Sequence, residues 1–98
     1  MAPMFFIQGD TIKKTLRFKN LDSSTDTFQV WFTCKSLQQK VQLTYVENTD
    51  WLLQIDAETS KNFRIGEFYF DITIVNDNEQ ETVIYNGVVT VLNKINTL

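Results

Sequence analysis

Histidine is absent from this chain of 98 residues, and cysteine occurs once, at Cys34. Without histidine, neither a Ser-His-Asp site nor a Cys-His site can form, and the commonest side-chain ligand of transition metals is missing. An internal disulfide and a thiolate zinc site each need more than one cysteine. We therefore expect no catalytic residues, no metal site and no cofactor, and we expect that the chain is not an enzyme.

Glycine and proline are also scarce, with three copies and one copy. This scarcity argues against a linker or a low-complexity chain. No apolar stretch approaches the ~20 residues that a membrane-spanning helix needs. The N-terminal sequence MAPMFFIQGD has an apolar run too short for a signal peptide, with no basic residue before it. We expect a protein that is made in the cytoplasm and makes no membrane contact.

Positive charge is in short supply, since the net charge is -3. A negative chain has no broad attraction to nucleic acid. Lys13, Arg17 and Lys19 do share one face of a predicted strand, which would suit a phosphate or an acidic partner. No aromatic ring is interleaved with these charges for stacking, so we interpret them as a solvated strand face or a charged edge. We expect no nucleic-acid partner.

Apolar residues make up 43% of the sequence and aromatic residues 13%, which is enough for one packed domain. Alternation of apolar and polar residues predicts a series of short strands, and one segment has slight helical character. The predicted strands cover 4–8, 11–20, 27–35, 41–45, 51–55, 67–75 and 80–92, and 57–63 is predicted to form at most a turn or two of helix. The polar segments 21–26 and 36–40 are predicted connections.

Turns about every ten residues are typical of a sandwich or a small barrel. No connection can hold a crossover helix, which excludes parallel βαβ units. We therefore predict an all-β fold, an antiparallel immunoglobulin-like β-sandwich of about seven strands, with a small β-barrel as the alternative. The sequence predicts a single domain over residues 1–98, in which 1–8 is either a docking arm or the first strand.

The single cysteine follows an alternating apolar set, Phe28, Val30 and Phe32. The shared phase predicts that Cys34 lies on the core face of its strand. Because no histidine is present to activate it, we expect a buried and unreactive thiol.

The segment 66–92, GEFYFDITIVNDNEQETVIYNGVVTVL, predicts two long strands joined by a polar turn. The first strand has an inner face of Phe68, Phe70, Ile72 and Ile74. The second has apolar residues on both faces, with a bulge or bend expected at Asn86-Gly87. A strand with two apolar faces needs a second covering surface, which another protein chain can supply.

Carboxylates near this hairpin are the remaining candidates for chemistry. Glu79 and Glu81, with Asp71 on the preceding strand, could be read as a glycosidase pair, but a small filled core leaves little room for the cleft. The run Asn76-Asp77-Asn78-Glu79 has the composition of a calcium loop without its spacing or its central glycine. We interpret this run as a hairpin turn.

A family pattern is present in the same segment. It reads Gly-x-Phe-x-Phe-Asp-Ile-x-Ile, a polar turn, and Thr-x-x-x-x-Gly-x-x-x-Val, with Gly-Asp-Thr upstream. The residues are Gly66, Phe68, Phe70, Asp71, Ile72, Ile74, Thr82, Gly87 and Val91, with Gly9, Asp10 and Thr11 upstream. The pattern resembles small immunoglobulin-like phage virion proteins, such as the N-terminal domain of upper baseplate proteins and stand-alone head or tail accessory proteins. The turn NDNEQ departs from it, because that turn usually carries a glycine. The resemblance implies a fold and a virion setting and no catalytic residues.

We therefore expect a non-enzymatic virion structural protein, favouring an auxiliary capsid or head-decoration protein that binds other virion proteins or copies of itself. A tail, connector or baseplate component is one alternative. A carbohydrate-binding module for host-surface glycans is another, because Trp31, Tyr69 and Tyr85 could present flat rings. No small-molecule substrate is expected. The predicted interface residues are Met4, Phe5, Phe6, Trp31, Tyr69, Ile84 and Val88.

Overall fold

The computed structural model describes residues 4–19 and 28–94, which form eight β-strands and two short helical turns. The strands are β1 (Met4–Ile7), β2 (Ile12–Arg17), β3 (Phe28–Cys34), β4 (Gln39–Gln42), β5 (Thr44–Glu47), β6 (Asp50–Ile55), β7 (Gly66–Asn76) and β8 (Glu81–Leu92). The helical turns are a 3₁₀ helix, η1 (Lys35–Leu37), and an α-helix, α1 (Ala57–Ser60). The predicted loop at 21–26 lies outside the described residues.

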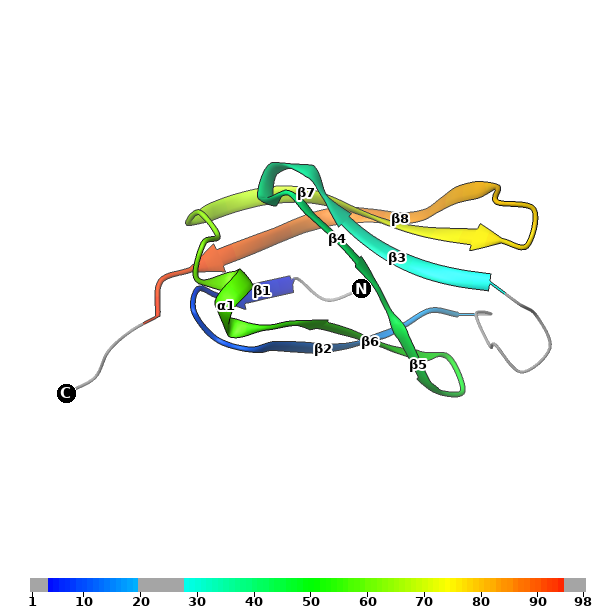
Figure 1. The fold of residues 1–98 in the computed structure, drawn as a ribbon, viewed down its shortest axis with the longest axis horizontal. Helices are drawn as coiled ribbons and strands as arrows, with labels where there is room; N and C mark the ends of the chain where they lie inside the picture. The colour runs from blue at the N-terminus through cyan, green and yellow to red at the C-terminus, as the bar shows by residue number, and fades with distance from the viewer. Residues whose placement is uncertain (1–3, 20–27, 95–98) are drawn as a thin grey trace.

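The strands form two sheets that face each other (Figure 1). The large sheet has the strand order β1-β8-β7-β3-β4, and the small sheet has the order β2-β6-β5. The predicted all-β immunoglobulin-like sandwich is confirmed, with one correction: β1 pairs with β8 in parallel, while the other pairs are antiparallel. The parallel pair needs no local crossover, because β1 and β8 come from opposite ends of the described chain.

The segment after β3 differs from the prediction of a connector at 36–40 and one strand at 41–45. The chain makes η1, enters β4 at the edge of the large sheet, and continues as β5 in the small sheet (Figure 1). Leu43, between β4 and β5, is buried, and its N–H donates to the carbonyl of Val30 at 2.8 Å. The predicted alternation of apolar and polar residues over 41–45 is therefore present. The segment is divided between two sheets, however, with β4 in the large sheet and β5 in the small sheet.

Aromatic rings fill the space between the sheets. The ring of Phe32 lies 5.9 Å from that of Phe6 and 5.2 Å from that of Phe70, measured between centroids. On the facing sheet the Trp51 ring lies 5.5 Å from the Phe28 ring, and Trp51 is 3% exposed. Tilted rings at these separations stabilise the core beyond the area that they bury.

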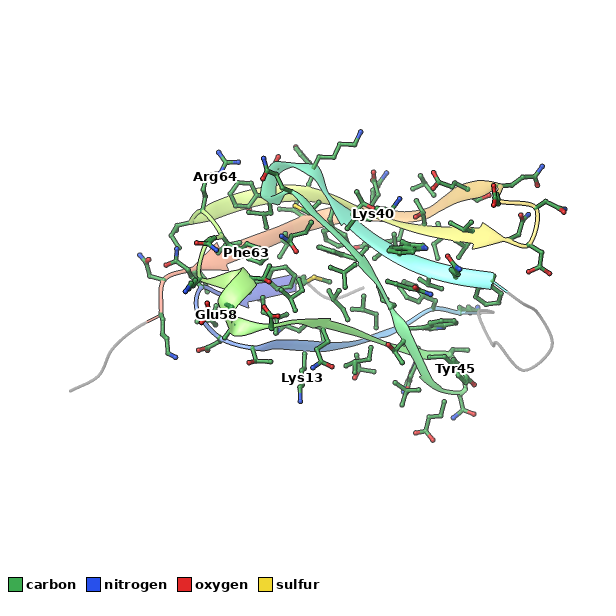
Figure 2. The ribbon with its side chains drawn as sticks, in the orientation of Figure 1. Lys13, Lys40, Tyr45, Glu58, Phe63 and Arg64 are labelled. Atoms are coloured by element: carbon green, nitrogen blue, oxygen red, sulfur yellow. The ribbon has the colours of Figure 1, made fainter. Side chains whose placement is uncertain are left out.

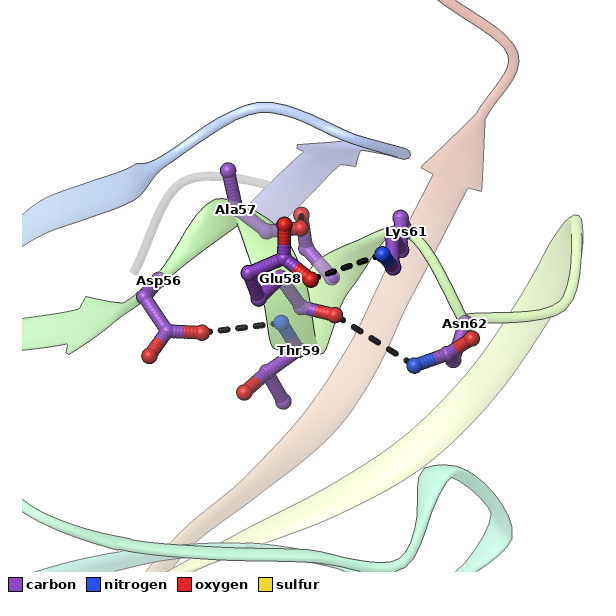
Figure 3. Close-up of polar contacts among 7 residues, drawn as sticks. Asp56, Ala57, Glu58, Thr59, Lys61 and Asn62 are labelled. Atoms are coloured by element: carbon purple, nitrogen blue, oxygen red, sulfur yellow. Dashed lines mark hydrogen bonds and ion pairs between the residues drawn. The ribbon is translucent and has the colours of Figure 1, made fainter.

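Helix α1 closes the connection from β6 to β7, as the slight helical character of 57–63 predicted (Figure 3). Asp56 caps it by accepting a hydrogen bond from the Thr59 N–H at 2.8 Å. The Lys61 ammonium lies 2.7 Å from the Glu58 carboxylate, and the Asn62 side-chain amide donates to the Glu58 carbonyl at 3.3 Å. Local polar contacts therefore define this short helix.

The pairing of β7 with β8 contains a bulge at Ile84. Ile72 pairs with Tyr85, but the next residue, Thr73, pairs with Val83, so Ile84 has no partner across the strand. Ile84 and Tyr85 both pack against the core, while Val83 is 54% exposed. The predicted bulge at Asn86-Gly87 is thus wrong in position, because Asn86 and Gly87 are regularly paired.

Gly87 has a packing role. It pairs with Phe70 across the two strands, and a β-carbon at this position would lie 2.9 Å from the Tyr85 ring and 3.2 Å from the Phe70 ring. Because glycine has no side chain, the Tyr85 and Phe70 rings can pack directly against the backbone at this position.

We predict that Gly87→Ala destabilises the protein by about 1–3 kcal/mol, because the added methyl group displaces two packed rings. Urea unfolding of the variant and the parent measures the difference. The matched control is Asn86→Ala, which alters the exposed neighbour and is expected to cost less than about 1 kcal/mol. A Gly87→Ala variant as stable as the parent would contradict this packing role.

Asp56 gives a pH-dependent prediction. Hydrogen bonding from Thr59, first from its side chain and then from its backbone N–H, lowers the pKa of Asp56 from its ordinary value. The ionised cap therefore contributes stability that is present above the unfolded pKa of about 3.9 and is lost as the pH falls through the folded pKa. We expect the wild type to be more stable than Asp56→Asn at neutral pH, with the difference disappearing in acid. Asparagine keeps the cap without the charge. A constant difference in urea midpoint across this pH range would refute the assignment.

Candidate functional site

Exposed apolar side chains gather at one end of the outer face of the large sheet. Tyr69 on β7 and Val88 on β8 are paired, and their side chains are 82% and 38% exposed. Phe5 pairs with Thr90, which follows Val88 on the same face, so Phe5 lies diagonally beside Val88. Leu92 continues the row along β8 and is also exposed. We call Phe5, Tyr69, Val88 and Leu92 the apolar strip.

Tyr69 stands between two shallow hollows. One has a volume of about 160 Å³ and is lined by Glu67, Phe68, Tyr69 and Val88. The other has a volume of about 520 Å³ and is lined by Tyr69, Phe70, Asp71, Asn86, Gly87 and Val88. A protruding tyrosine beside concave surface, with polar residues at the margin, is the shape that a protein partner can enclose.

Of the two alternatives for residues 1–8, the described part forms the first strand, so Met4 and Phe6 are wrong as interface residues. Met4 and Phe6 are buried, and they pair with Val89 and Val91 in the large sheet. The segment is the first strand, so its side chains alternate between the core and solvent. Of the three predicted residues, Phe5 alone is turned outward.

The prediction for Ile84 also needs correction, because Ile84 is half-buried and packs against the core of its own domain. The bulge moves the outward position on this strand to Val83, which we did not predict. Alternation could not locate Val83, since apolar residues occupy both phases of the strand. The second apolar face that was predicted for this strand is present, with Val88 as predicted and Val83 in place of Ile84.

Trp31 lies on the same outer face but apart from the apolar strip. It pairs with Thr73, which is four residues from Tyr69 along β7, about 13 Å at the rise of a strand. Its ring is half-buried, and its indole N–H donates to the Gln29 side chain at 3.0 Å. The structure therefore brings Tyr69, Val88 and Phe5 together, and it separates Trp31 from them.

The basic face of β2 is partly neutralised. The Arg17 guanidinium lies 2.8 Å from the Asp50 carboxylate, and its hydrogen bond lowers the pKa of Asp50. Lys13 points away from both sheets (Figure 2). This arrangement is that of a solvated strand face.

Cys34 is fully buried, and desolvation raises the pKa of its thiol above the ordinary value. Within residues 4–19 and 28–94, no group of three or more cysteine or acidic side chains is placed to hold a metal ion. The helices in this part of the chain are all too short or too polar to cross a membrane.

No protein-family model and no curated protein matches the chain. The fold resembles a solved structure described as "a putative glycoside hydrolase" from Bacteroides vulgatus, with a TM-score of 0.50 and 11% sequence identity. The match covers 95% of this chain and 17% of the other, so this chain spans a small part of that protein's length.

This finding corrects the expectation that the chain is not an enzyme. The expectation is wrong, because a similar fold occurs within a protein that is described as an enzyme. The missing histidine therefore does not exclude an enzyme. At 11% identity the likeness shows the fold alone, and it assigns neither activity nor substrate to this chain.

Cys34 provides a test of the core. We predict that Ellman's reagent labels Cys34 on the order of a thousandfold more slowly in the native protein than in the protein unfolded by denaturant. Burial both blocks access to the thiol and disfavours its reactive thiolate form. The control is Thr15→Cys in a Cys34→Ala background, which places a thiol on an exposed strand face and is expected to react at once. Rapid labelling of native Cys34 would contradict its position.

Proposed function

We propose that this domain is a phage virion structural protein that binds other virion proteins through the apolar strip, and that it serves as an auxiliary capsid or head-decoration protein. The observation that carries the protein-binding part is Tyr69, which is 82% exposed and directly paired with exposed Val88. The virion setting rests on the resemblance of the 66–92 hairpin to phage virion proteins.

The energetics of the apolar strip support a protein partner. Each Å² of apolar surface removed from water is worth roughly 25 cal/mol before the costs of association. Tyrosine is enriched where binding energy concentrates, because it buries a rigid ring and keeps a polar hydroxyl. Glu67 and Asp71, which flank Tyr69 on β7, supply a polar margin at which a partner can set its orientation.

A particle with many identical binding sites also lowers the affinity that each single contact must provide. When many copies attach to a symmetric lattice, linked weak contacts give stable attachment. Attachment through a strip of four apolar residues is consistent with such a lattice. A tail, connector or baseplate position would use the same strip in a ring of fewer copies.

We expect the double variant Tyr69→Ala, Val88→Ser to weaken attachment to purified particles by about thirtyfold, the equivalent of one strong interface residue of about 2 kcal/mol. Occupancy is measured by quantitative mass spectrometry of particles assembled with the variant. Electron microscopy of the same particles shows whether the domain sits on the capsid lattice or in the tail.

The matched control is Val46→Ser, which alters an exposed apolar residue of β5 in the small sheet. It should leave occupancy unchanged, and all variants should melt within a few degrees of the parent. Full occupancy of the double variant would refute the apolar strip as the interface. A protein absent from purified particles would refute the virion setting.

A further inference from the structure

A polar hollow of about 580 Å³ lies on the outer face of the large sheet, at the end where β7 turns into β8. Its volume is within the range of small-molecule sites. Its lining includes Trp31 and Gln29 from β3, Lys40 from β4, and Asp77, Glu79 and Glu81 from the turn and the start of β8. None of these residues belongs to the apolar strip.

Trp31 provides a flat surface held in one orientation. Its indole N–H donates to the Gln29 side-chain oxygen at 3.0 Å, which restrains the ring. The Lys40 ammonium, from the neighbouring strand, lies over the ring at 5.3 Å from its centre. The ring is half-buried, so part of its surface is open to the hollow.

The carboxylates come from a well-defined turn. The Asn76 side-chain oxygen accepts hydrogen bonds from the N–H groups of Asn78 and Gln80, each at 3.0 Å. The N–H of Glu79 donates to the Asn76 carbonyl at 3.0 Å. These bonds hold Asp77 and Glu79 at the border of the hollow beside Glu81. The predicted hairpin turn thus brings Glu79 and Glu81 together with Asp77, whereas Asp71 lines the separate hollow beside Tyr69.

The charges of the lining select among ligands. Three carboxylates disfavour an anionic ligand, and the Lys40 ammonium over the ring disfavours a second cationic group at the same ring. An uncharged ligand with many hydroxyl groups suits both conditions. Lys40 and Gln29 can donate hydrogen bonds, the carboxylates can accept them, and the apolar face of a sugar ring can pack on Trp31.

We infer that this hollow binds an uncharged oligosaccharide, with one sugar ring stacked on Trp31 and its hydroxyl groups bonded by Lys40, Glu79 and Glu81. This inference gives a specific site to the carbohydrate-binding module that the sequence suggested as an alternative function. The inference is independent of the proposed protein-binding function, because it uses a different part of the outer face.

The experiment uses the two tryptophans as reporters. Trp31 lines the hollow, and Trp51, which is 3% exposed, lies in the core. The ¹⁵N-labelled protein is titrated with chitohexaose and with maltohexaose while the two indole N–H signals are followed by NMR. We expect the Trp31 signal to shift and saturate at millimolar sugar, with the Trp51 signal unmoved.

The variants separate binding from folding. Trp31→Ala should weaken binding at least about tenfold, followed through backbone amides of the turn, while an unchanged Trp51 signal reports an intact core. Glu81→Gln should also weaken binding with the ring retained. Tyr69→Ala should bind sugar as the parent does, so a failure of the apolar strip and a failure of this site are distinguishable.

Three results would overturn the inference. The first is no movement of the Trp31 signal with either oligosaccharide and no binding on an array of neutral glycans. The second is equal binding by Trp31→Ala, or movement of both tryptophan signals together. The third is a response to a hexa-arginine peptide without any response to oligosaccharides, which would mark the hollow as a site for a basic protein segment.

Discussion

The pairing of β7 with β8 determines the surface of this molecule, because a single unpaired residue, Ile84, shifts the phase of β8. On one side of the bulge, Val89 and Val91 face the core while Val88 faces solvent. On the other side, the outward position passes to Val83. Side chains alternate strictly along a strand, so one extra residue reverses the faces of every position beyond it.

The outer face of the large sheet consequently has two chemically different ends. At the end formed by β1, β7 and β8, the apolar strip is exposed, and Tyr69 stands between the two shallow hollows. At the end nearest the β7–β8 turn, Trp31 lies among polar and charged groups. Polar side chains such as Asp71 and Asn86, which are paired across the strands, lie between the two ends. One face of a small domain can therefore carry two kinds of contact without shared residues.

Local patterns predicted the elements well where one phase of a strand was clearly apolar. The alternation of Phe28, Val30 and Phe32 located β3 and the buried Cys34, and the polar run after β7 located the turn. The patterns failed where both phases were apolar or where one strand-like segment served two sheets. In the first case Ile84 was misplaced, and in the second the division at Leu43 was missed.

The candidate site was predictable only in part. Tyr69 was out of phase with the apolar residues of its own strand, which is a local signal, so its exposure could be expected. The neighbourhood of Tyr69 was not predictable, because Phe5 and Val88 reach it through pairing between distant parts of the chain. For the same reason the sequence could not show that Met4 and Phe6 complete the protein's own core.

Composition and alternation are local properties, and they were enough to predict the all-β fold class, the approximate strands and the buried thiol. The pairing of the folded strands, by contrast, sets which residues of β8 face outward, and it places Trp31 and Tyr69 at separate positions on one sheet. Strand register and bulges arise from contacts between segments far apart in sequence, and a local pattern does not encode them.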